Sequence, residues 1–273
     1  MHSFWYLLAE DAPRPGAHNM AADQHILSLI EDGTLDVPVL RIYAWSKPTL
    51  SLGYHQQWQE TVQKESLKEL NIDLVRRWTG GRAVLHDHEE ITYSVIAPMT
   101  APFSRKISHN YTLIGKALAF FSDLGAGRSK MTETEESVDE VKKMRHAPCF
   151  ASLAKSEIEG GGRKMIGSAQ KLGKSGFLQH GSIPLIHRPD VLEAITGTRL
   201  DMSRLMTSLD EHYQEVGLEL PSRNDLVQRL IAGFEQAFDI KFKTLAEAGF
   251  PDQKAIETIA QQRFSRDDWT FRK

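Results

Sequence analysis

Runs of strand-forming residues dominate the first two thirds of the chain, and this feature limits the fold more than any other. Branched and aromatic residues cluster in these runs, and turn residues separate them at hairpin length. The predicted strands cover residues 1–11, 37–45, 49–56, 72–78, 91–98, 163–170 and 176–185. Because few of them alternate with helices, the pattern favours an α+β fold, a mixed sheet with packed helices, over a doubly wound fold.

Periodic apolar residues predict helices between and after these strands. The predicted helices cover residues 18–33, 60–70, 110–125, 189–195 and 222–240. Asn19 is the expected N-cap of the first helix, and Ser222 with Asp225 is typical of a capping box. We expect a single domain over residues 1–273, with a strand-rich core over about 1–190 and a helical part over about 190–273.

Charge, hydropathy and cysteine content exclude several functional classes. The net charge of −3 gives no overall basic surface for nucleic acid. No apolar run approaches the roughly 20 residues of a membrane helix, and the N-terminus lacks the basic start of a signal peptide. Cys149 is the only cysteine, so an internal disulfide is excluded and a reducing cytoplasm is the expected location. No heptad pattern indicates more than a monomer.

The stretch RRWTGGRAVLH, Arg76–His86, places paired glycines after a predicted strand. No helix pattern follows it, so it lacks the strand–loop–helix arrangement of a phosphate site. A second glycine motif, Gly167–Ser175, has five residues between its glycines where a Walker A loop has four, and it joins two predicted strands. Composition alone favours a tight turn at Arg76–His86, although paired glycines also allow a ligand to approach the backbone.

Cys149 has two interpretations. A lone cysteine is commonly a buried, inert hydrophobe. A nucleophilic thiolate needs a nearby cation, because a free thiol with a pKa of about 8.5 is mostly protonated at neutral pH. Lys164, His86 and His180 are the candidate neighbours. The segment His86–Glu90 has potential metal ligands, but a second cluster is missing and we predict no metal.

Several motifs in fixed order resemble the lipoate–protein ligase and octanoyltransferase superfamily. They are HNMAADQHIL, PVLRIYAWSKPTLSLGYHQ, RRWTGGRAVLH, APCF around Cys149, GGRKMIGSAQ and LQHGSI, within residues 4–190. The resemblance implies the α+β catalytic domain shared with biotin–protein ligases and class II aminoacyl-tRNA synthetases. It also implies that the RRWTGG loop lines a pocket for an eight-carbon acyl chain, and that no cofactor is needed.

Three activities occur in this superfamily, and the sequence differs at two places from the pattern of the ATP-dependent ligases. An ATP-dependent lipoate ligase typically has a third glycine in the loop, where this chain has Arg82, and it needs no cysteine. The resemblance therefore favours a cysteine-dependent octanoyl-[acyl-carrier-protein]:protein N-octanoyltransferase. An amidotransferase that moves octanoyl between lipoyl proteins also uses a cysteine, but GGRAVLH, GSAQ and LQHGSI are more similar to the carrier-protein-dependent enzyme.

The resemblance assigns roles to individual residues. Cys149 is expected to carry the octanoyl group as a thioester, and Lys164 to stabilise its thiolate. The expected substrate-binding residues are Arg77, Gly80, Gly81, Arg82, His86, Gly167, Ser168, Ala169, His180 and Gly181. For the arginines, steering of an acidic carrier protein and internal pairing both stay open. His180 is either a pocket residue or a satisfied core histidine.

Octanoyl-acyl carrier protein is the expected donor, and a lipoyl domain or a glycine-cleavage H protein the expected acceptor. Two other classes stay open. A cysteine hydrolase would use the same thiolate and release the acyl group to water. A noncatalytic lipoyl-domain-binding protein would keep its function without Cys149.

Overall fold

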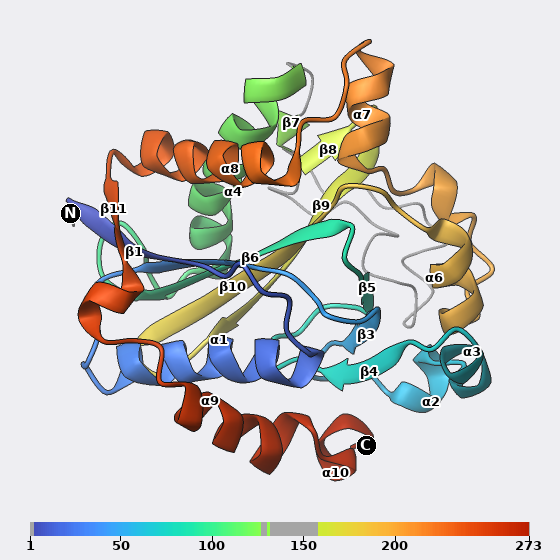
Figure 1. Ribbon diagram of the computed structural model, residues 1–273, viewed down its shortest axis with the longest axis horizontal. Helices are drawn as coiled ribbons and strands as arrows, with labels where there is room; N and C mark the ends of the chain where they lie inside the picture. Colours follow the sequence, from blue (N-terminus) through green and yellow to red (C-terminus); the bar gives the residue numbers. More distant parts are fainter. Residues whose placement is uncertain (1–2, 127–129, 132–157, 273) are drawn as a thin grey trace.

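The computed structural model describes residues 3–126, 130–131 and 158–272 (Figure 1). Cys149, the predicted nucleophile, lies outside the described residues. Most of residues 128–146, a stretch rich in charged residues, lies outside them as well.

The main sheet has eight strands in the described part of the chain, in the order β11-β1-β2-β6-β10-β9-β8-β7. Their bounds are β1 Phe4–Ala9, β2 Val39–Tyr43, β6 Glu90–Pro98, β7 Lys130–Met131, β8 Ile158–Gly160, β9 Arg163–Leu172, β10 Gly176–Pro184 and β11 Lys241–Thr244. β1 runs parallel to β11 and β2, and the other neighbours are antiparallel. The predicted mixed sheet of an α+β fold is confirmed.

A second sheet of three strands, in the order β4-β3-β5, lies at one end of the main sheet (Figure 1). Its strands are β3 Thr49–Leu52, β4 Asp73–Arg76 and β5 Val84–His86. β3 is parallel to β4 and antiparallel to β5. The turn at Lys47-Pro48 therefore carries the chain from one sheet to the other, and the short strand β5 was not predicted.

Helices cover both faces of the main sheet. The longer ones are α1 Gly16–Glu31, α4 Ile107–Ala126 and α8 Arg223–Phe238. The shorter ones are α2 Trp58–Thr61, α3 Lys64–Glu69, α6 Pro189–Thr196, α7 Leu209–Glu215, α9 Gln253–Ile259 and α10 Asp267–Thr270, with single turns η2 Met202–Arg204, η3 Leu245–Ala248 and η4 Ala260–Phe264. No helix in these described ranges combines the length and apolarity that crossing a membrane requires.

Three local predictions need correction. The helix expected over residues 60–70 is interrupted at Val62, whose backbone is extended, and forms α2 and α3. Helix α1 begins at Gly16, and Asn19 is not its N-cap but a buried residue whose amide donates to the carbonyls of Arg14 and Ala44. The C-terminal part expected to be helical also supplies β11, which pairs with β1. The capping role of Ser222 is confirmed, because its hydroxyl accepts from the Asp225 amide.

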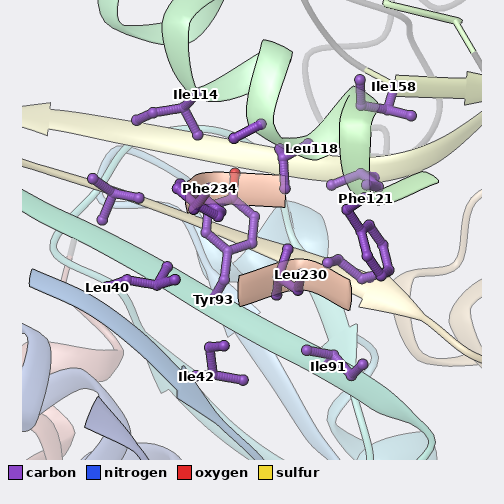
Figure 2. Packing of buried hydrophobic residues seen from close by; sticks show 14 of the residues in the cluster. Leu40, Ile42, Ile91, Tyr93, Ile114, Leu118, Phe121, Ile158, Leu230 and Phe234 are labelled. Carbon is purple, nitrogen blue, oxygen red and sulfur yellow. The ribbon is translucent and has the colours of Figure 1, made fainter. Parts of the chain in front are cut away.

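Strand alternation explains why each face of the sheet has its own core. Ile91 and Tyr93 of β6 pack with α4 and α8, where Phe234 and Leu118 complete the largest apolar cluster (Figure 2). Ile96 of the same strand points to the opposite face and packs with α1. The C-terminal elements α9, η4 and α10 lie outside α1 and cover it (Figure 1). The face that carries α1 is the one that holds the candidate site.

Candidate active site

A cleft opens between α1, the main sheet and the small sheet. The space between its walls is ≈ 330 Å³, part of it open to solvent. Its lining residues are Met20, Tyr43, Trp45, Arg77, Val84, His86, Thr92, Gly167, Ser168, Ala169, His180, Gly181 and Ser182. Apolar side chains and glycine backbone make up most of this wall, and such a lining suits an apolar ligand held by few polar contacts.

The cleft brings most of the predicted substrate-binding residues together. Those that line it are Arg77, His86, Gly167, Ser168, Ala169, His180 and Gly181. Gly80, Gly81 and Arg82 do not line it but form the adjoining loop, where a Cβ on Gly81 would lie 3.5 Å from the Cβ of Ala169. The segment Gly167–Ser175, for which a Walker A loop was rejected, lies in β9 and the turn to the antiparallel strand β10, between two strands as predicted.

Two glycines are required by close approach. A Cβ on Gly53 would lie 1.9 Å from the carbonyl oxygen of Gly81, so the glycine loop packs directly on the end of β3. A Cβ on Gly181 would lie 2.5 Å from the Tyr93 ring and 2.8 Å from the Ser168 hydroxyl. Real Cβ atoms do not tolerate such distances, so these positions fix the loop and the floor of the cleft.

Arg77 holds the glycine loop from beneath. Its Nη2 donates to the carbonyls of Gly80 and Arg82, both at 2.9 Å. Its Nη1 donates to the Ser51 carbonyl at 2.6 Å and the Ser51 hydroxyl at 2.8 Å, and its Nε donates to the Thr79 hydroxyl at 3.3 Å. These bonds account for the five N–H groups of a guanidinium. Arg77 therefore acts as the internal support of the loop.

His180 connects the Thr79 hydroxyl to a buried carboxylate. Its Nε2 lies 2.7 Å from Thr79 Oγ1 and its Nδ1 lies 3.2 Å from Asp23 Oδ2. Asp23 is 1% exposed, and it also accepts from Arg41 at 2.8 Å and from the Ser94 hydroxyl at 2.9 Å. The geometry therefore favours the interpretation of His180 as a satisfied histidine that orients its neighbours.

His86 forms the same kind of chain on the other side of Arg77. Its Nε2 lies 2.7 Å from the Ser51 hydroxyl, and its Nδ1 lies 2.8 Å from Glu90 Oε1. The His86 ring stacks on Trp45 with ring centres 4.0 Å apart. Glu90 Oε2 accepts from Ser182 at 2.7 Å. His86 therefore lines the cleft, and Glu90 holds its ring from behind the lining.

The chain through His180 fixes the donor and acceptor roles of its hydroxyl. Arg77 donates to both hydroxyl oxygens, so the Thr79 proton is directed to Nε2 of His180. Nδ1 of His180 then carries the ring proton and donates a hydrogen bond to Asp23. Burial lowers the pKa of His180 despite the opposing effect of Asp23, and so keeps the ring neutral. Burial alone would raise the pKa of Asp23, but Arg41 and His180 hold it below its ordinary value.

The open question about Arg76 and Arg77 is decided by burial. Arg76 is 0% and Arg77 3% exposed, so neither lies on a surface that steers a partner. Arg76 donates to the carbonyls of Thr270, Gly53 and Gln56. Both arginines therefore bond internally, Arg76 to backbone carbonyls and Arg77 to carbonyls and hydroxyls.

Lys164 lies on β9 and is 2% exposed, so it is a buried lysine and not a surface charge. Its backbone pairs with Leu205 and Thr207. A bulge interrupts the pairing of β8 with β9 between Lys164 and Ile166. Bulges of this kind commonly re-aim side chains next to active sites.

Sequence reasoning missed the site roles of Asp23, Arg41 and Glu90, although a signal existed for the first two. Asp23 lies on the apolar stripe of its helix, between Met20 and Leu27. Arg41 stands in the middle of an apolar strand. Charged residues at core positions are almost always paired, so each implied a buried partner.

Residues 15–235 match the family described as the lipoyl protein ligase A/B catalytic domain. Octanoyltransferase LipM of Halalkalibacterium halodurans is 33% identical over 97% of this chain and 98% of its own length. Octanoyltransferase LipM of Moorella thermoacetica is 40% identical over 79% of this chain and 77% of its own length.

Solved structures share the fold at lower identity. Lipoate-protein ligase A bound with ATP has a TM-score of 0.77 at 21% identity, covering 98% of both chains. The bi-partite lipoate protein ligase from Thermoplasma acidophilum, described with its E2 lipoyl domain, has a TM-score of 0.74 at 19% identity, covering 99% of this chain and 97% of that one. The predicted lipoate-protein-ligase fold is confirmed.

Proposed function

The chain belongs to the lipoyl protein ligase A/B catalytic domain family, and on that premise we propose that it transfers octanoyl from octanoyl-acyl carrier protein to a lysine of a lipoyl-accepting protein. Near-full-length relatives are octanoyltransferases, so the chain is an acyltransferase. The observation that carries the finer proposal is the mostly apolar cleft beside the glycine loop, which suits an aliphatic acyl chain.

The proposed reaction has two steps. The Cys149 thiolate attacks the octanoyl carbonyl carbon, the bond to the carrier sulfur breaks, and the carrier thiolate leaves and takes up a proton. The acceptor lysine, as a neutral amine, then attacks the thioester, the Cys149 thiolate leaves as the amide forms, and the amine nitrogen releases one proton to solvent. Two easier steps replace one difficult step, and thioester-to-amide transfer is downhill without ATP.

Lys164 is the proposed cation beside Cys149. A buried ammonium is costly unless it is paired, and the burial of Lys164 supports a role opposite a thiolate. Gly167 and Gly181 allow backbone to approach the acyl group, because neither presents a side chain to the cleft. His180 and His86 serve as positioning residues that hold Arg77 and, through it, the loop.

The acceptor is a lipoyl domain or a glycine-cleavage H protein. The Thermoplasma acidophilum ligase described with its E2 lipoyl domain supports this class of partner. The single cysteine and the carrier-bound donor fit a reducing cytoplasm, and we assign the chain there as a monomer.

Transfer without ATP tests the proposal against its alternatives. Octanoyl-acyl carrier protein and a lipoyl domain are mixed with the protein, and the mass of the lipoyl domain is measured, with a domain lacking its acceptor lysine as control. Octanoylation of the intact domain alone is expected. Modification of the domain only from free octanoate with ATP and Mg²⁺ would identify a ligase. Release of octanoate in the absence of the acceptor would identify a hydrolase. The absence of both reactions would identify a binding protein.

A further inference from the structure

A surface of aromatic rings and cations lies beside the cleft. We call it the cation–aromatic surface, and its partly exposed members are Tyr54, Trp78, Lys171, Arg263, Trp269 and Arg272. The Lys171 ammonium lies 4.9 Å from the centre of the Trp78 ring and 5.5 Å from that of Tyr54. Stacking on a ring attracts a cation but leaves its charge in place.

The two arginines of this surface bond only to neutral oxygens in the described part of the chain. Arg263 donates to Gln24 Oε1 at 2.7 Å. Arg272 donates to the Tyr54 carbonyl at 2.8 Å and lies 3.5 Å from the centre of the Tyr54 ring. Within residues 3–126 and 158–272, no carboxylate lies within the 4.0 Å of an ion pair to Lys171, Arg263 or Arg272.

A buried cation beneath adds to this charge. The Nη2 atom of Arg76 is buried and has no hydrogen-bond partner among the described residues. Burial, together with Arg272 and Arg77, lowers the pKa of Arg76 to about 10. The chain as a whole carries a net charge of −3, so this positive face is a local reversal of sign.

The surface borders the cleft directly. Lys171 follows the cleft residue Ala169 by two positions on β9, so both side chains share one face of the strand, about 7 Å apart. The Tyr54 amide donates to the Thr79 carbonyl at 2.8 Å, which places Tyr54 against the glycine loop. A partner bound to this surface can therefore place a short flexible group in the cleft.

We infer that the cation–aromatic surface is the docking site for the acidic face of the acyl-bearing carrier protein. The inference rests on the proposed function. Unpaired cations around a cleft steer an anionic partner and raise its association rate, and aromatic rings supply contact area. The acceptor must approach with a lysine side chain that is an ammonium in solution before it reacts as a neutral amine. A positive surface disfavours that approach, so the observations favour the donor.

The test compares Lys171→Gln, Arg263→Gln and Arg272→Gln, singly and combined, with Lys243→Gln as control. Lys243 also lies over a ring, Phe4, at 4.1 Å, but belongs to β11 at the far edge of the main sheet. Lys171→Gln is the single variant expected to fold like the wild type, because the Lys171 ammonium makes no hydrogen bond within the described ranges. Three donors are used at low and high salt: octanoyl-acyl carrier protein, octanoyl-coenzyme A and neutral octanoyl-pantetheine.

The combined variant is expected to lose about tenfold in kcat/KM with the carrier protein at low salt, and the loss should shrink at high salt. Activity with octanoyl-pantetheine should stay unchanged, and Lys243→Gln should match the wild type throughout. An unchanged kcat/KM with the carrier would overturn the inference. Equal losses of kcat/KM with all three donors would also overturn it. A loss with octanoyl-coenzyme A as large as that with the carrier would overturn it too, because the surface would then recognise the phosphates of the donor.

Direct binding separates this inference from the proposed function. Binding of acyl carrier protein to wild type and variants is measured by calorimetry beside a lipoyl domain and a single-stranded oligonucleotide. If the wild type transfers octanoyl from none of the donors, the proposed function fails, and the binding measurement alone decides the docking site. Weakened binding of the lipoyl domain or the oligonucleotide, with carrier binding unchanged, would assign the surface to another partner and reject the inference.

Discussion

At the residue scale, the close contact between Gly53 and the glycine loop governs the shape of the cleft. A methyl group at position 53 would meet the Gly81 carbonyl at 1.9 Å, and backbone must move to relieve the clash. We predict that Gly53→Ala lowers the free energy of unfolding by about 3 kcal/mol and reduces octanoyl transfer, because the loop shifts. Urea unfolding and initial rates measure both effects.

Gly80→Ala is the matched control for that substitution. A Cβ on Gly80 meets nothing within 4 Å, so the variant is expected to stay within about 1 kcal/mol of the wild type. Equal destabilisation of the two variants would show that the loop does not pack on Gly53 in solution.

His180 gives a residue-scale prediction about pH. Its pKa is lowered by burial in the folded protein, while an unfolded histidine binds a proton below about pH 6.5. The unfolded state therefore takes up more protons, so the stability due to neutral His180 is present above that pH and is lost as the pH falls toward the folded pKa.

The free energy of unfolding should decline between neutral and mildly acidic pH, and His180→Gln should flatten the decline. His55→Gln, at an exposed position, is the control and should keep the wild-type slope. Denaturant unfolding at several pH values makes the measurement. A His180→Gln slope identical to the wild-type slope would contradict a neutral, buried His180.

Individual site residues were predictable only where a motif carried them. The family motifs contained His86, Gly167 and His180, and all three line the cleft. The support role of Arg77 was not predictable, because its acceptors come from positions 51, 79, 80 and 82, which only the folded loop brings together.

At the element scale, α10 fixes the base of the glycine loop although it is far away in sequence. The Trp269 indole donates to the Arg76 carbonyl at 3.0 Å, and the Thr270 carbonyl accepts from Arg76. We predict that Trp269→Phe, which keeps most of the ring contact, costs about 1 kcal/mol of stability and lowers transfer activity. Thermal unfolding and the transfer assay report the two effects.

Trp58→Phe removes an indole N–H that bonds to nothing in the described part of the chain, and it should be near neutral. A Trp269→Phe variant as stable and active as Trp58→Phe would mean that α10 does not hold the loop.

Elements with strong local patterns were predicted, and those defined by long-range pairing were not. The apolar stripe of α8 and its Ser222 cap predict the helix. Strand β11, KFKT, has no buried residue and owes its conformation to pairing with β1. Strand β5 is only three residues long, too short for its own residues to predict a strand.

At the scale of the whole molecule, the fold brings three distant segments to one cleft: α1 with Asp23, the glycine loop with Arg77, and the β9–β10 hairpin with His180. The mixed sheet was predictable because strand runs with short connections leave few other architectures. The division into two sheets was not predictable, because the Lys47-Pro48 turn is compatible both with pairing of the two strands that it joins and with their separation into different sheets.

The central claim is that the chain carries octanoyl covalently on Cys149, and intact mass measures it most directly. The protein is mixed with octanoyl-acyl carrier protein without ATP, beside Cys149→Ala. The account predicts a gain of roughly 126 Da on the wild type, removed by hydroxylamine and absent from the variant. No adduct on the wild type, or the same adduct on Cys149→Ala, would contradict it.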